Sequence, residues 1–193
     1  MKRLKQDQDG ATLTEFGFVA PILILMVMGI FDLGHSLYTS ALINGAMQDA
    51  GRDLTLESAG SREDAIDALV TSQVLKVAPS SSTITLEKLS HFDFTDIGEA
   101  EEFEDDNGDG ICNNNEVFVD LNENGLWDAD RGQQGIGGAR DAVLYTAIVS
   151  YPRLFPMAGL AGLPENVEIR ASTVLRNQPF DEQDRSTATG NCT

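Results

Sequence analysis

The chain has 193 residues and a formal net charge of −18 at neutral pH. This excess of acidic groups argues against binding of a nucleic acid or an anionic membrane surface by the outer domain, the part of the chain that follows the N-terminal region. The charge is uneven, because residues 93–130 contain fourteen Asp and Glu and no Lys or Arg. Such a segment is either a solvated acidic loop or a site for cations.

The N-terminal region joins a basic tip to a long apolar stretch. The tip holds three Lys and Arg, no other precedes Arg52, and residues 16–31 carry no charge. Sixteen residues of helix span about 24 Å, and the apolar pattern continues past Asp32 far enough to cross a bilayer. The positive charge at one end predicts a cytoplasmic N-terminus, with the chain after about residue 40 outside the membrane.

Two other interpretations fit the same stretch. A basic tip before an apolar core also describes a cleaved secretory signal, but such a core has about 7–15 residues and ends at an A-x-A-like site. No such site follows Phe31 convincingly. A plain signal anchor, in which Glu15 is only a carboxylate at the headgroup boundary, remains open.

A few residues in this stretch carry a more specific resemblance. Gly10-Ala11, Glu15 at the fifth place after Gly10, and Pro21 inside the apolar run resemble the N-terminus of type IV pilin-like proteins. The continuation F-G-F-V-A-P-I-L-I-L-M-V-M-G-I-F-D-L-G-H-S-L-Y is similar to the TadE-like minor pilins, or pseudopilins, of tight-adherence (Tad) pili. The resemblance covers about residues 10–55.

The resemblance implies a processed structural subunit of an adhesion pilus. A prepilin peptidase would cut after Gly10, so that Ala11 becomes the first residue and Glu15 the fifth. A lone carboxylate in a hydrophobic helix costs a few kcal/mol, which the α-amino group of a neighbouring subunit would offset during assembly. The implied partners are other pilin or minor pilin subunits, the prepilin peptidase, the inner-membrane assembly platform and membrane lipid. The implied location is the bacterial inner membrane, single-pass with a periplasmic head, or the extracellular pilus after assembly.

The remaining pattern predicts a small α+β head. Apolar residues recur every four positions up to Leu54, which extends the first helix to about residue 56. Ser61 caps a second helix, whose apolar residues at helical spacing include Val74, and Pro79 closes this segment. Alternating and β-branched residues predict three antiparallel strands, at 83–87, 141–151 and 167–175. The polar tail from Asn177 is expected to be mobile.

The expected organisation is therefore a leader at 1–10, a transmembrane and extended helix at 11–57, and an extracytoplasmic head at 58–193. The head is expected to hold a small antiparallel sheet of about three strands. An acidic insert at 93–138 separates the first strand from the second.

The first half of this insert matches a calcium-loop motif. Residues 105–116 fit D-x-[DN]-x-[DN]-G-x5-E without a gap. In such a loop, oxygens at positions 1, 3, 5, 7 and 9 converge on one hard cation, and the glutamate at position 12 closes the cage with both oxygens. Position 7 contributes its backbone carbonyl. The candidate ligands are Asp105, Asn107, Asp109, Ile111, Asn113 and Glu116.

A second copy of the motif starts at Asp120. Its position 12 is Arg131, which cannot bind a cation, and the neighbouring Asp130 is a possible substitute. The candidate ligands are Asp120, Asn122, Asn124, Leu126, Asp128 and Asp130. Only residues 117–119 separate the loops, and they favour a strand. The two loops therefore resemble the short calcium-binding loops of extracellular modules more than helix–loop–helix sensors. Such extracellular loops bind Ca²⁺ with affinities of ~10⁻⁴–10⁻³ M. Two offset copies favour calcium as a cofactor over a flexible acidic loop.

The two cysteines and two histidines add little chemistry. Cys112 and Cys192 would pair in an oxidising periplasm and stay free in a reducing cytosol, so the sequence leaves a disulfide open. Cys112 occupies position 8 of the first loop, which does not bind the ion. Neither histidine lies in a nucleophile-elbow, phosphate-loop or zinc-type pattern, and we expect no enzymatic activity.

Two functions follow from these patterns. The first is a minor pilin that supports assembly or priming of a Tad-type pilus. The alternative is a signal-anchored, extracytoplasmic calcium-binding interaction module that is not built into a filament. Only the first requires a cut between Gly10 and Ala11.

Overall fold

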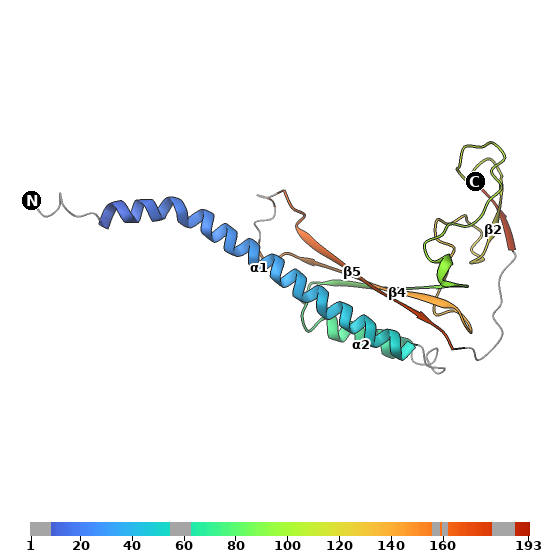
Figure 1. Cartoon of the computed structure of the whole chain (residues 1–193), viewed down its shortest axis with the longest axis horizontal. Coiled ribbons are helices and arrows are strands. Elements are labelled where there is room, and N and C mark those ends of the chain that lie inside the picture. Colours follow the sequence, from blue (N-terminus) through green and yellow to red (C-terminus); the bar gives the residue numbers. More distant parts are fainter. Residues whose placement is uncertain (1–8, 55–62, 156–158, 160–161, 179–187) are drawn as a thin grey trace, which may run out of the picture.

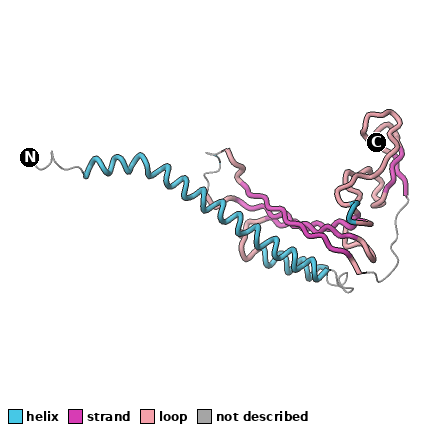
Figure 2. Tube along the Cα trace, in the orientation of Figure 1, coloured by secondary structure: helices cyan, strands magenta, loops and turns pink. Residues whose placement is uncertain are grey.

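The computed structural model describes residues 9–54, 63–155, 159, 162–178 and 188–193. A long helix leads into an α+β body, and a smaller loop-rich lobe lies at the far end of that body (Figure 1). We call residues 93–132 together with 188–193 the lobe, and the helices with the larger sheet the body. Figure 2 shows that loops dominate the lobe, whereas helices and strands make up the body.

Helix α1 (Asp9–Leu54) has two halves in different surroundings. Its 46 residues extend roughly 69 Å at ~1.5 Å per residue. The first half projects from the molecule, and Phe18 is 82% exposed there. In the second half Ile43 and Met47 are each 1% exposed. Pro21 lies inside the helix without ending it. The expected continuation to residue 56 falls outside the described residues.

The body is a four-stranded antiparallel sheet with α1 and α2 (Glu63–Val74) on one face. The strand order is β3-β1-β4-β5, with β1 at Thr83–His91, β3 at Gln133–Gln134, β4 at Ala142–Pro152 and β5 at Asn166–Arg176. In register, Leu86 lies opposite Ala147 and Ala147 lies opposite Ala171. Period-two alternation therefore places one set of apolar residues under the helices. The core contains Ile43, Met47, Ala50, Leu54, Ile66, Val70, Val74, Val143, Tyr145, Ala147, Val149, Tyr151, Ile169, Ala171 and Leu175.

A polar cluster attaches α2 to the sheet. The ammonium group of Lys88 contacts Glu63 at 2.9 Å and Asp67 at 2.6 Å, and the Tyr145 hydroxyl donates to Asp67 at 2.7 Å. Burial, and then the neighbouring Asp67, raise the pKa of Tyr145 above its ordinary value. Tyr145 therefore stays a hydrogen-bond donor in the folded protein.

A second contact ties the sheet to α1 where its exposed half ends. Arg153, just after β4, forms an ion pair with Asp32, and the Leu154 N–H donates to the same carboxylate at 3.3 Å. Both charged side chains are mostly buried. Contact between head and helix therefore reaches back to Asp32.

The lobe contains a second, two-stranded sheet that the sequence did not predict as a sheet. Strand β2 (Val117–Asp120) pairs antiparallel with β6 (Ala188–Asn191), and Phe103 makes an isolated bridge to Phe118. A short 3₁₀ helix, η3 (Phe94–Asp96), opens the insert with Asp93 as its cap. The described residues thus form six strands in two sheets, and the expectation of about three strands was wrong. The expectation of a mobile tail was also wrong for residues 188–191, because they pair with β2.

Candidate calcium loops and the apolar helix

The first loop turns its side-chain oxygens inward. The Asp105 carboxylate accepts N–H groups from Gly108, Asp109 and Gly110 at 2.6, 3.2 and 2.9 Å. Asn107 accepts from the Asp109 N–H, and Asp109 from the Ile111 N–H, both at 2.8 Å. Gly110 has a φ of 75°, a left-handed conformation that glycine adopts without steric cost. The candidate ligands at positions 1, 3 and 5 are therefore held by the backbone of their own loop.

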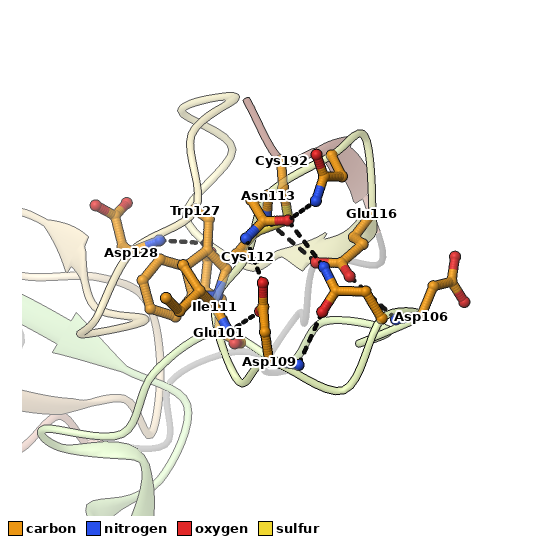
Figure 3. Close-up of a disulfide and its surroundings, with 12 residues drawn as sticks. Glu101, Asp106, Asp109, Ile111, Cys112, Asn113, Glu116, Trp127, Asp128 and Cys192 are labelled. Atoms are coloured by element: carbon orange, nitrogen blue, oxygen red, sulfur yellow. Dashed lines mark hydrogen bonds between the residues drawn. A yellow bond between two sulfur atoms is a disulfide. The ribbon is translucent and has the colours of Figure 1, made fainter.

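Glu116 closes this loop from position 12. Its Oε1 accepts the Asp106 N–H at 3.0 Å, and its Oε2 accepts the Asn113 N–H at 3.1 Å. Figure 3 shows this carboxylate between the two segments of the loop. The Asn113 amide also donates to Asp109 at 2.9 Å. That bond, followed by the one from the Ile111 N–H, lowers the pKa of Asp109 and so favours its charged form.

The second loop repeats most of this pattern, with the bonds at the same loop positions except for the one from position 4. Asp120 accepts N–H groups from Asn124 at 3.1 Å and from Gly125 at 2.8 Å. Asn122 accepts from the Asn124 N–H at 3.1 Å, and Asn124 accepts from the Leu126 N–H at 2.7 Å. Gly125, like Gly110, has a positive φ, of 78°. The two copies of the sequence motif are thus two copies of one backbone fold.

The candidate ligands at positions 3, 5 and 9 of each loop come together. In the first loop, the Asn107 amide donates to Asn113 at 3.1 Å. In the second, the amides of Asn122 and Asn124 donate to Asp128 at 2.8 and 2.6 Å. Among the described residues, no three or more His, Cys, Asp or Glu side chains are grouped as a metal centre. The two loops instead offer mixed carboxylate, amide and carbonyl oxygens, the donor types that Ca²⁺ prefers.

Residues 130 and 131 make contacts outside the second loop. Asp130 lies 2.6 Å from Nε2 of His91 and accepts the Gly132 N–H at 3.0 Å. The Arg131 guanidinium donates to the carbonyl of Ala100 at 3.0 and 2.6 Å. Asp130 at position 11 and Arg131 at position 12 therefore each bind another part of the chain.

Glu101 stands beside the second loop, and the sequence reasoning missed it. Its Oε1 accepts the Leu121 N–H at 2.8 Å, and its Oε2 accepts the Asp128 N–H at 3.1 Å. Glu101 precedes the loop by nineteen residues, so no motif of fixed spacing would find it. Its burial, at 2% exposure beside exposed acids, is seen only in the structure.

The lobe is fastened at its tip by a disulfide. Cys112 and Cys192 are bonded, with their Cα atoms 5.2 Å apart, as Figure 3 shows. The Asn115 N–H donates to the Cys192 carbonyl at 3.1 Å, and the Cys192 N–H donates to the Glu116 carbonyl at 2.8 Å. The first loop and the C-terminal strand β6 therefore form one unit.

At the other end of the molecule, α1 carries the residues predicted for processing and assembly. Gly10 and Ala11 lie in its first turns, and Glu15 lies on its exposed half. From Thr12 to Leu54 the helix is long and apolar enough to cross a membrane, by length and composition. That finding is compatible with a single-pass membrane anchor.

The sequence of this helix was compared with known protein families. Residues 10–52 match the model of a family described as TadE-like protein. The chain carries a TadE-like N-terminal region. No curated protein and no solved structure gives a significant match.

The TadE-like region coincides with a structural unit. It covers nearly the whole of α1 and includes Gly10, Ala11, Glu15 and Asp32. The resemblance drawn from these residues is therefore confirmed for residues 10–52, which are similar to the TadE-like family. The lobe and its two loops lie outside the matched residues.

Proposed function

We propose that this protein is a minor pilin, a structural subunit that supports assembly or priming of a Tad-type pilus. One observation carries the proposal: α1 is a single helix whose first half is exposed and apolar, while its second half forms part of the core of the head. Such a helix stays in lipid before assembly and packs against its neighbours afterwards. Its proposed partners are other pilin subunits and the inner-membrane assembly platform.

The contact between Asp32 and Arg153 supports this division of the helix. Residues 12–31 precede the contact, and twenty residues of helix span about 30 Å, the thickness of the hydrocarbon core. Within this span, Glu15 is the only ionisable side chain. The head would therefore begin at the membrane surface, on the side opposite the basic N-terminal tip.

We further propose that a prepilin peptidase removes residues 1–10. The motivation is a small-residue junction, Gly10-Ala11, between the basic tip and the apolar helix. The new α-amino group would lie at the start of the helix, where it can neutralise Glu15 of a neighbouring subunit. This neutralisation offsets the cost of a buried carboxylate.

Intact-mass measurement on protein taken from its native membrane tests the processing step. We expect a mature chain that begins at Ala11, and a Gly10→Leu variant that keeps residues 1–10. Gly17→Leu is the matched control, because a side chain at Gly17 meets no other atom of the protein within 4 Å. Native protein that still begins at Met1 in piliated cells would instead indicate the uncleaved, signal-anchored module.

The first loop adds a proposed cofactor. We propose that Ca²⁺ binds between Asp105, Asn107, Asp109, Asn113, the Ile111 carbonyl and Glu116, as a structural ion of the head. Glu116 supports this proposal because it is 3% exposed and forms no ion pair with a described Lys, Arg or His. A buried carboxylate without a cation partner costs several kcal/mol.

A further inference from the structure

We propose that the second loop is also a complete Ca²⁺ site, and that Glu101, from outside the loop, supplies the closing carboxylate. Glu101 thus takes the place of Arg131 at position 12. The inference extends the calcium proposal for the first loop but concerns a different site, and its test separates the two. The other donors are Asp120, Asn122, Asn124, Asp128 and the carbonyl of Leu126.

The argument starts from the equivalence of two carboxylates. Glu116 accepts the N–H groups of positions 2 and 9 of the first loop, at 3.0 and 3.1 Å. Glu101 accepts the N–H groups of positions 2 and 9 of the second loop, at 2.8 and 3.1 Å. Glu116 lies at the end of the loop that it closes, whereas Glu101 precedes its loop in the sequence. Both oxygens of each carboxylate nevertheless accept N–H groups from the same two loop positions.

The segment around Glu101 is fixed by contacts on both of its sides. Its N–H donates to the Asp128 carbonyl at 3.0 Å, and its carbonyl accepts the indole N–H of Trp127 at 2.8 Å. Arg131 holds the preceding carbonyl, that of Ala100. On the other side, the Phe103 ring meets the Trp127 ring edge to face, with centroids 5.9 Å apart. Arg131 thus helps to position Glu101, the residue that we propose as the closing ligand in place of position 12.

Burial of charge is an independent reason to expect a cation. The buried acids among the described residues are Glu101, Glu116 and Asp120, at 2, 3 and 5% exposure. None of them forms an ion pair with a described Lys, Arg or His, and the Arg131 guanidinium contacts Asp96 and Glu102 instead. Buried charges in proteins are generally paired or bound to metal ions, and these three contact the backbone of the two loops.

The donor set favours Ca²⁺ over other cations. Glu101, Asp120 and Asp128 carry three negative charges, and the remaining donors are amide and carbonyl oxygens. Six residues that offer only oxygen suit the six to eight ligands of Ca²⁺. The set contains no thiolate or imidazole, which Zn²⁺ and copper prefer. Mg²⁺ usually keeps several waters instead of filling a protein cage.

Calcium stoichiometry tests the inference on the full-length protein in detergent. Native mass spectrometry should find two Ca²⁺ in the unaltered chain, one in Glu101→Gln and one in Glu116→Gln. Glu104→Gln is the matched control, because it removes the same charge from an exposed neighbour, and it should keep two. The second-loop affinity in Glu101→Gln should fall by more than the ~10–100-fold typical for loss of an outer-shell partner.

Terbium emission assigns the lost ion to a loop. Trp127 is the single tryptophan of the chain and occupies position 8 of the second loop, between two proposed ligands. Emission of Tb³⁺ sensitised by this indole should fall strongly in Glu101→Gln and much less in Glu116→Gln. Asp120→Asn should reproduce the Glu101→Gln result. Retained calcium in the first loop and an intact disulfide show that the Glu101→Gln lobe is folded.

Two results would overturn the inference. One is a Glu101→Gln chain that still binds two Ca²⁺ with unchanged terbium emission. The other is an unaltered chain with a single Ca²⁺ that only Glu116→Gln removes, which leaves the first-loop proposal intact. An unaltered chain that binds no Ca²⁺ would overturn both calcium proposals but not the assignment as a pilus subunit.

Discussion

The body and the lobe of this protein are held together by different means. The body encloses a core of apolar side chains from α1, α2 and the four-stranded sheet. In the lobe, by contrast, the buried apolar side chains of the described residues are Phe118 and Cys192, while three acids are buried there. The lobe relies on backbone N–H groups, a disulfide and, as we propose, two cations. We therefore expect loss of the ions to affect the lobe and to leave the body folded.

The largest expected effect is that of the disulfide. Cys112→Ser opens a link with a sequence separation of 80 residues, which corresponds to about 4.5 kcal/mol for complete unfolding by the chain-entropy estimate. Hydrogen exchange should show rapid loss of protection in β6 and little change in β4. Cys192→Ser should give the same result. Unchanged protection of β6 would mean that its pairing with β2 suffices.

A cavity in the body should destabilise the body and not the lobe. Ile66→Ala removes a side chain that is 3% exposed in α2, and we expect a loss of about 3 kcal/mol in the free energy of unfolding. Leu69→Ala is the matched control on the same helix, since Leu69 is 45% exposed; it should cost under about 1 kcal/mol. Denaturant unfolding measures both. Equal losses would contradict the packing described for α2.

Removal of calcium should affect the lobe alone. At a free Ca²⁺ concentration a hundredfold above Kd, one bound ion stabilises the folded state by about 2.7 kcal/mol. Chelator should therefore lower the melting temperature of the lobe and leave that of the body in place, and Glu116→Gln should remove part of this response. Differential scanning calorimetry with Ca²⁺, Mg²⁺ and chelator checks the prediction. An equal shift with Mg²⁺ would indicate a solvated acidic insert.

The same contrast explains what the sequence could predict. Period-two alternation located β1 and β5, β-branched and aromatic residues located β4, and the four-residue repeat located α1, because an apolar core creates all three patterns. Strands β3 and β6 were missed, since Gln133–Gln134 and A-T-G-N bury almost no apolar surface. Their pairing depends on partners far away in the sequence. Glu101 was missed for the same reason: the loop that it contacts begins nineteen residues later.

The TadE-like segment was the most predictable part, because its chemistry is local. A basic tip, Gly10-Ala11, Glu15 and a long apolar run lie within about thirty residues. The candidate ligands within each motif could be named as easily, since their spacing is fixed, and their binding of Ca²⁺ stays a prediction. How the two loops, the disulfide and β6 combine into one lobe required the structure.

The central claim is that the exposed half of α1 faces lipid and then neighbouring pilus subunits. Site-specific photo-crosslinking from position 18 tests it most directly, because Phe18 is 82% exposed, with position 69 on the head as the control. In piliated cells we expect position 18, and not position 69, to crosslink to other pilin subunits, and to crosslink to lipid when assembly is blocked. Crosslinks from position 18 only within its own chain, in both conditions, would contradict the account.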